Sequence, residues 1–200
     1  MRIRYPKIRE LKEALRSIFS RPYTNKFPFA PHIPFERFRG RPSFNEEYCI
    51  GCTACAQVCP AKAISFKDAD GKRRLTVRWD RCIFCGQCQA NCPPEKGIVL
   101  SNEFDLATTG KRQELRQSID KDLAFCPCCG EMIAPLSQIA WVAKRIGPLT
   151  FSNASLMLFM ARSAGLSSPE KKSPEKKEPG RADRMRVLCP RCRREAVIRS

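Results

Sequence analysis

Two runs of cysteine carry the clearest chemistry in this sequence. Each run has the spacing Cys-x-x-Cys-x-x-Cys-x-x-x-Cys-Pro, and the second run repeats the first 33 residues further along the chain. The first run comprises Cys49, Cys52, Cys55 and Cys59, and the second comprises Cys82, Cys85, Cys88 and Cys92. The first three thiolates of such a run ligate one [4Fe–4S] cluster, whereas the fourth cysteine ligates the other cluster of the pair.

The spacing therefore predicts two [4Fe–4S] clusters with crossed fourth ligands. The expected ligands of cluster A are Cys49, Cys52, Cys55 and Cys92. The expected ligands of cluster B are Cys82, Cys85, Cys88 and Cys59. Structural zinc knuckles or disulfides are the alternative, but two complete copies that each end in Cys-Pro argue against it.

Two Cys-Pro-x-Cys segments near the C-terminus form a second candidate metal site. Four thiolates in a tetrahedron hold Zn²⁺ or a rubredoxin-like iron, and we favour Zn²⁺. The expected ligands are Cys126, Cys129, Cys189 and Cys192. Cys128 is the spare cysteine, and the sequence leaves open whether it replaces Cys126 or Cys129 as a ligand. Cysteines that hold no metal are the alternative.

The elements that position these cysteines begin with a basic arm, predicted over residues 1–44. Its first part is expected to be an amphipathic helix, because apolar residues recur at helical spacing. These residues are Ile8, Leu11, Leu15, Ile18 and Phe19. Residues 24–44 are rich in Pro and Phe and are expected to form an extended docking strap. We expect the arm to dock on a partner subunit, with the membrane surface as a second option.

Residues 45–101 are predicted to form a ferredoxin domain that holds both clusters. Short strands are expected at 63–66, 75–79 and 97–100, with a turn at 68–71. Residues 102–123 are expected to be a connector, with a short polar helix around Lys111 to Arg116.

The predicted extension at 124–200 resembles a zinc ribbon with a long insert between its two cysteine pairs. The insert is expected to hold one helix from Ile133 to Ile146 and a second helix capped by Asn153. A loop at about 166–184 contains a near-repeat of Ser-Pro-Glu-Lys-Lys without apolar residues, which is typical of disorder. The whole chain is therefore predicted to belong to the α+β class.

Composition narrows the function classes. The chain has 200 residues, 13 cysteines and a formal net charge of +17. So many cysteines suit a metalloprotein in a reducing compartment. The N-terminus has no apolar signal core, and no run reaches 18 apolar residues, so we expect a soluble or peripheral protein. The positive charge suits acidic partner subunits or an anionic membrane surface as well as nucleic acid.

The quoted motifs resemble a known family, the ferredoxin-like subunits of complex I with two [4Fe–4S] clusters. Besides both cysteine runs, the resemblance rests on Arg37-Phe38-Arg39-Gly40, on Cys59-Pro60-Ala61-Lys62-Ala63-Ile64 and on Asn102-Glu103-Phe104. Cys82-Ile83-Phe84-Cys85-Gly86 and the C-terminal cysteine pairs are similar to the branch found in group 4 membrane-bound hydrogenases and formate hydrogenlyase. The spacing in Cys126-Pro127-Cys128-Cys129 is narrower than in that branch.

This resemblance implies an electron-relay subunit. Its implied partners are the small and large hydrogenase subunits and a ferredoxin or a formate-dehydrogenase-side donor. Its implied location is peripheral, on the cytoplasmic side of the cell membrane. No independent catalytic site is expected, because the sequence has no nucleotide loop, triad or histidine metal site. The alternatives are a complex I-like relay linked to quinone or NADH and, more remotely, a nucleic-acid-binding protein with structural clusters.

Overall fold

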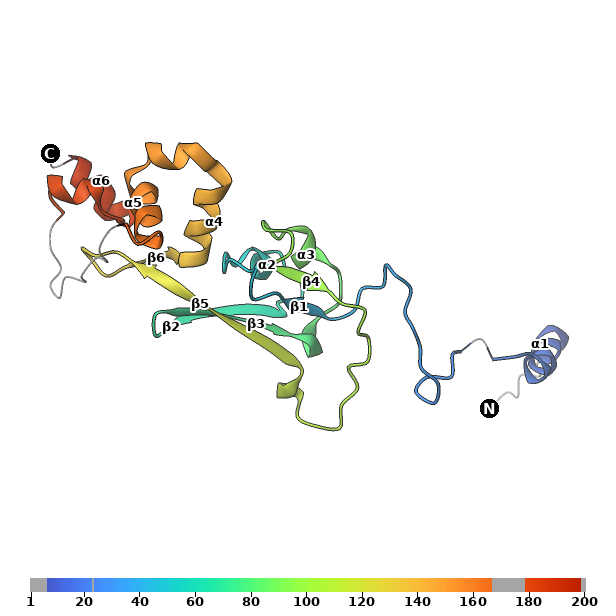
Figure 1. Cartoon of the computed structure of the whole chain (residues 1–200). Helices are drawn as coiled ribbons and strands as arrows, with labels where there is room; N and C mark the ends of the chain where they lie inside the picture. Colours follow the sequence, from blue (N-terminus) through green and yellow to red (C-terminus); the bar gives the residue numbers. More distant parts are fainter. Residues whose placement is uncertain (1–6, 23, 167–178, 199–200) are drawn as a thin grey trace. The chain divides into compact units, whose positions relative to one another are not determined.

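A computed structural model of the chain describes residues 7–22, 24–166 and 179–198. The chain divides into two compact units, residues 1–38 and residues 39–200. The α-helices are α1 (Ile8–Phe19), α2 (Ala54–Gln57), α3 (Gln87–Ala90), α4 (Leu136–Ile146), α5 (Ala154–Ser163) and α6 (Pro190–Ile198). The strands are β1 (Pro42–Phe44), β2 (Ile64–Ala69), β3 (Lys72–Arg78), β4 (Ile98–Leu100), β5 (Arg116–Phe125) and β6 (Met132–Pro135), as Figure 1 shows.

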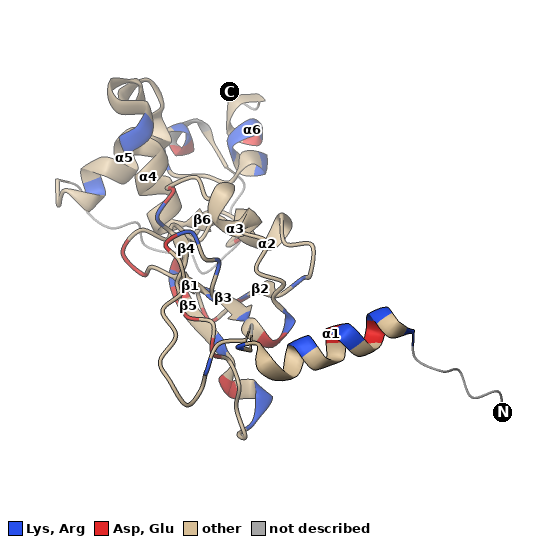
Figure 2. Cartoon of the chain, turned by 90° about the vertical axis from the view of Figure 1, so that its right-hand side faces the viewer, with Lys and Arg blue, Asp and Glu red and all other residues tan. Residues whose placement is uncertain are grey.

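In the first unit, the predicted amphipathic helix is confirmed as α1. The Lys7 amide donates a hydrogen bond to the Glu10 carboxylate at its N-terminus, at 3.2 Å. Basic residues are distributed along the helix (Figure 2). Among the described residues of this unit, the apolar stripe stays exposed, since Ile8 and Phe19 are each 87% exposed. The last part of the predicted strap, residues 39–44, belongs to the second unit and contains β1.

In the second unit, antiparallel strands form two sheets. β1 pairs with β4, and the second sheet has the order β2-β3-β5-β6. The strands predicted from the sequence at 63–66, 75–79 and 97–100 are confirmed as β2, β3 and β4. The core between the sheets and the cysteine turns contains Leu75 and Val77, which are fully buried, and Ile98, which is 1% exposed.

The predicted polar helix in the connector is wrong. Only Arg112–Glu114 form a 3₁₀ turn, and the chain then enters β5, the longest strand of the unit. β5 pairs with β3 from Arg116 to Asp122 and then with β6. Ile119 opposes Leu75 in the register, so the supposed connector contributes a residue to the core. Local charge suggested a helix, whereas the vacant edge of β3 favours a strand.

The C-terminal insert follows the prediction in part. The first helix begins at Leu136 rather than Ile133, because residues 132–135 form β6. Asn153 caps α5 as expected, accepting hydrogen bonds from the amides of Ser155 and Leu156. Most of the loop predicted at about 166–184 lies outside the described residues, and its end is a 3₁₀ helix at Arg181–Met185. The second cysteine pair lies at the start of α6, and not in a β-hairpin as in a zinc ribbon.

No helix in the described part of the chain is long and apolar enough to cross a membrane.

Candidate metal centres

The two cysteine runs adopt the same backbone shape. α2 and α3 are each four residues long, begin 33 residues apart and contain the third cysteine of their run. Left-handed backbone recurs at three equivalent pairs of positions, namely Gly51 and Phe84, Thr53 and Gly86, and Lys62 and Glu95. Residues other than glycine adopt this backbone conformation at a cost in free energy. The turn is therefore imposed by the tertiary structure of the repeat.

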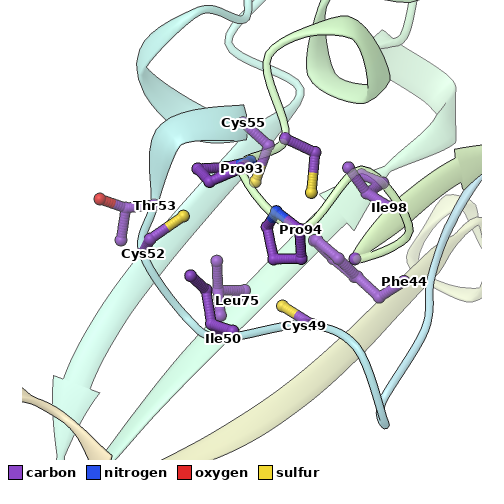
Figure 3. Close-up of a pocket in the computed structure, with 12 residues that line it drawn as sticks. Phe44, Cys49, Ile50, Cys52, Thr53, Cys55, Leu75, Pro93, Pro94 and Ile98 are labelled. Atoms are coloured by element: carbon purple, nitrogen blue, oxygen red, sulfur yellow. The ribbon is translucent and has the colours of Figure 1, made fainter. Parts of the chain in front are cut away.

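One cavity gathers the four expected ligands of cluster A. It is lined by Cys49, Cys52, Cys55 and Cys92, together with Phe44, Ile50, Leu75, Pro94 and other mostly apolar residues. In Figure 3 the labelled sulfur atoms of Cys49, Cys52 and Cys55 point into this cavity. The fourth cysteine of the second run thus lies beside the first three cysteines of the first run. An apolar cavity lined by four thiols fits a [4Fe–4S] cluster.

The expected ligands of cluster B also lie within electrostatic reach of one another. Burial raises the pKa of the Cys82 thiol, and the neighbouring Cys59 and Cys85 thiolates raise it further. Cys59 and Cys82 come from different runs, so this proximity matches the crossed arrangement. Backbone amides approach the sulfur atoms here. Ala63 N lies 3.2 Å from Cys59 Sγ, and Phe84 N lies 3.4 Å from Cys82 Sγ.

The protonation chemistry of these thiols favours a metal. Burial, with a contribution from the Cys49 thiolate, raises the pKa of Cys55 to about 12. Burial likewise raises the pKa of Cys88 to about 11. Several thiolates in one apolar cavity therefore require a compensating positive charge, which iron ions supply. The Cys88 thiolate also raises the pKa of Cys55, which shows that the two sets are adjacent.

Two arginines that were not predicted as site residues contact these turns. Arg39 donates to the Cys85 carbonyl at 3.2 Å, and Arg73 donates to the Gly51 carbonyl at 3.1 Å. The signal for Arg73 was present in the sequence. It lies two residues before Leu75 in an alternating strand, so the pattern places a charge on the buried face of β3.

The C-terminal cysteines come together as a second set. The sulfur atoms of Cys126, Cys129, Cys189 and Cys192 all lie within 4.8 Å of one another. Cys126 and Cys129 lie in the turn between β5 and β6, where Gly130 N donates to Cys126 O at 2.9 Å. Cys189 precedes α6 and Cys192 lies in its first turn. The set is mostly buried, with Cys189 only 1% exposed.

Hydrogen bonding and burial act on these four thiols in opposite directions. Burial raises the pKa of Cys126, but the backbone amides of Cys189, Cys129 and Cys128 outweigh it and lower the pKa to about 7. Burial raises the pKa of Cys189 to about 11. Amides aimed at sulfur are typical of cysteine turns that bind a metal, and four thiols at this separation fit one tetrahedral ion.

Cys128 lies outside this group of four. It is 4% exposed, and burial and the Asp183 carboxylate raise the pKa of its thiol, while a hydrogen bond to the Arg186 side chain lowers it. The side chain therefore faces the 3₁₀ helix at Arg181–Met185. The structure favours Cys126 and Cys129 over Cys128 as the ligand pair.

Comparison with known proteins agrees with the paired cysteine sets. Residues 48–96 match the family model of the 4Fe-4S dicluster domain. The chain is 33% identical over 112 residues to NADH-quinone oxidoreductase subunit I 2 of Geobacter metallireducens, covering 51% of this chain and 85% of that protein. The chain belongs to the NADH-quinone oxidoreductase subunit I family. This chain is an iron–sulfur electron-transfer subunit, and its match to the dicluster domain supports two [4Fe–4S] clusters.

A second relative is a subunit of a formate hydrogenlyase. The chain is 37% identical over 108 residues to formate hydrogenlyase subunit 6 of Escherichia coli, covering 52% of this chain and 57% of that protein. Among solved structures, it is similar to a chain of the membrane-bound sulfane sulfur reductase (MBS), an archaeal respiratory membrane complex. That similarity has 28% sequence identity and a TM-score of 0.40, over 56% of this chain and 62% of that chain.

Proposed function

We propose that this chain relays single electrons through two [4Fe–4S] clusters to the hydrogenase small subunit of a membrane-bound, formate hydrogenlyase-like complex. The ligand sets are those predicted for clusters A and B, and the C-terminal set of four cysteines holds one Zn²⁺ or a rubredoxin-like iron. The partners are the small and large hydrogenase subunits and a ferredoxin or formate-dehydrogenase-side donor. The chain lies peripherally on the cytoplasmic side of the membrane.

The observation that carries this proposal is the joining of a dicluster domain to a second set of four cysteines in one compact unit. β5 runs from its pairing with β3 directly to Cys126, so the C-terminal set is attached to the cluster domain by a strand. Half of this chain lies outside the alignment that covers 85% of the Geobacter subunit. The C-terminal cysteine pairs, which resemble those of the hydrogenase branch, are what favours that branch.

The chain's own residues perform three tasks in this role. When bound, the clusters supply one-electron redox chemistry. The crossed cysteines hold the two clusters close together, which keeps the transfer distance short. Leu75, Ile98 and Phe44 exclude water from the cavity of cluster A. Each cluster has four protein ligands, so no iron is left open to a substrate.

A complex I-like relay is the second candidate. The coverage of the Geobacter subunit I and the presence of further subunit I relatives favour it. It retains the same clusters and ligands but replaces the hydrogenase subunits with a quinone- or NADH-linked assembly.

The experiment that tests the proposal is isolation of the native complex from membranes, with identification of its subunits and measurement of Fe, Zn and Ni. We expect nickel and hydrogenase subunits together with this chain. Co-purification with quinone-binding subunits and without nickel would reverse the choice. In the same complex, Cys55→Ala should remove one cluster signal from the EPR spectrum and stop turnover. Full turnover without that cluster would refute the serial relay.

A further inference from the structure

Arg73 is a buried cation beside the predicted cluster A. It is 8% exposed. No other arginine or lysine is buried among the residues whose burial the structure describes. It shares the inward face of β3 with Leu75 and Val77, both fully buried. A charge at such a position has a desolvation cost that an apolar residue would not have. Arg73 therefore needs an explanation other than core packing.

The guanidinium of Arg73 is held in one orientation. It donates to both carboxylate oxygens of Asp68, at 2.8 and 2.9 Å. It contacts Met132 Sδ at 3.5 Å and lies 5.3 Å from the ring centroid of Phe66. Such bidentate pairs fix the geometry of a guanidinium more tightly than a single contact does.

The third guanidinium nitrogen of Arg73 is directed at the turn of cluster A. Its Nη1 donates to the carbonyl of Gly51 at 3.1 Å, and Gly51 lies between Cys49 and Cys52. A trans peptide places its carbonyl and its N–H on opposite sides, so this bond also orients the amide of Cys52. Gly51 has φ of +72°, and a Cβ there would lie 3.1 Å from Pro135 Cγ. The turn is thus fixed between β3 and the β5–β6 hairpin.

We propose that Arg73 is a positioning residue that raises the reduction potential of cluster A by holding a buried positive charge against the Gly51 carbonyl. This inference rests on the proposed ligands of cluster A. Net charge, hydrogen bonding and solvent exposure around a cluster set its potential. Reduction adds a negative charge, which a nearby buried cation stabilises with little screening by solvent. The charge of Asp68, whose side chain pairs with Arg73, partly offsets this effect.

The adjacent residue provides a matched control. Arg74 forms the same bidentate pair with Asp120, at 2.7 Å for both contacts, on the opposite face of the strand. Its side chain is 65% exposed. Substitution of Arg74 removes an equal charge and an equal ion pair from the same strand without contact to a cluster turn.

The experiment is an EPR-monitored redox titration of the full-length holoprotein carrying R73Q, R73K, D68N or R74Q. Loss of one signal in Cys55→Ala identifies cluster A, and cluster B serves as the internal reference. In R73Q the midpoint potential of cluster A should shift to more negative values, whereas in D68N it should shift to more positive values. R73K should remain close to wild type, and R74Q should shift neither cluster.

Opposite signs separate an electrostatic role from a structural one. If R73Q and D68N shift cluster A in the same direction, or if R74Q shifts it as much as R73Q, the proposal is wrong. If R73Q loses iron because Asp68 is left unpaired, the double variant R73Q/D68N should restore the iron content and still show a more negative cluster A. A wild-type potential in that variant would overturn the inference. A wild-type protein without two EPR-active clusters would instead contradict the proposed function.

Discussion

At the scale of single residues, the internal repeat shows which features the cluster turns require. Gly51 and Phe84 occupy equivalent positions and both have positive φ, at 72° and 54°. A glycine adopts this conformation freely, whereas Phe84 adopts it with strain that the surrounding structure must offset. The Phe84 amide nevertheless approaches Cys82 Sγ, so the turn geometry around sulfur outweighs the local preference of the side chain.

The predicted crossing of the ligands can be tested at two cysteines in equivalent positions. Cys92 lines the cavity with Cys49, Cys52 and Cys55, although it belongs to the second run. Cys92→Ala should therefore remove cluster A and leave cluster B, and Cys59→Ala should do the reverse. EPR of the reduced variants, with an iron content of roughly four per chain instead of roughly eight, checks this. Loss of cluster B in Cys92→Ala would show that each run holds its own cluster.

At the scale of elements, two close backbone approaches hold the domain together. Gly40 N donates to Ser101 O at 2.8 Å, and Arg41 N donates to Glu103 O at 3.0 Å, which extends the β1–β4 pairing. Gln117 of β5 then donates to the Phe44 carbonyl and accepts from its amide, at 3.3 and 2.7 Å. The segment before the cysteines is thereby attached to strands on both sides.

Gly40 tests this attachment. A Cβ at this position would lie 2.4 Å from Glu103 O and 2.5 Å from Ser101 O, both backbone atoms that cannot rotate away. Gly40→Ala should therefore reduce the free energy of unfolding by roughly 1–3 kcal/mol or more. Thermal unfolding of the anaerobic holoprotein measures the change. Gly180→Ala is the control, because a Cβ at Gly180 meets no atom within 4 Å. Equal stability of the Gly40 variant and wild type would contradict the packing.

The C-terminal set of four cysteines supports a prediction about metal content. Cys192→Ser should lose the bound Zn²⁺ or iron and destabilise α6, because Cys192 lies in the first turn of that helix. Cys128→Ser should keep the metal, since Cys128 faces Asp183 and Arg186 instead. Metal analysis of both purified variants distinguishes the two cysteines. Metal loss in the Cys128 variant, with retention in the Cys192 variant, would reverse the assignment.

At the scale of the whole molecule, the two units have different surfaces. The unit of residues 39–200 has its own core, whereas in the unit of residues 1–38 the apolar stripe of α1 stays exposed. Lys, Arg and Glu occupy most of the other positions of that helix (Figure 2). An amphipathic helix with its apolar face in solvent is typical of a segment that docks on another surface. We expect that surface to belong to a partner subunit.

This expectation is tested at two leucines. Leu11 and Leu15 are 55% and 51% exposed, and each would contribute roughly 1.5–3 kcal/mol when buried in an interface. The double variant L11Q/L15Q should weaken association with the native complex by about 100-fold or more. The measurement is retention of the chain during purification of the complex, with both clusters checked by EPR. Lys12→Gln on the polar face should be retained, and equal retention of all three proteins would refute the docking role.

The sequence alone was sufficient for the chemistry and for much of the local structure. The cysteine spacing determined the dicluster class, because the reach of a short turn limits which thiolates share a cluster. Helical periodicity predicted α1, and the Asn153 cap predicted the start of α5. These features depend on neighbours in sequence, so local rules are adequate for them.

Features that depend on residues far apart in the sequence were decided only by the tertiary structure. The segment Arg116–Phe125 forms β5 because β3 offers an unpaired edge, which no local pattern reveals. The separation of Cys128 from its neighbours Cys126 and Cys129 depends on Asp183 and Arg186, more than 50 residues away. Arg73 is held beside the cysteine turn by a hydrogen bond to the carbonyl of Gly51, 22 residues earlier in the chain. The sequence predicts the ligands, whereas the fold decides which charges and amides surround those cysteines.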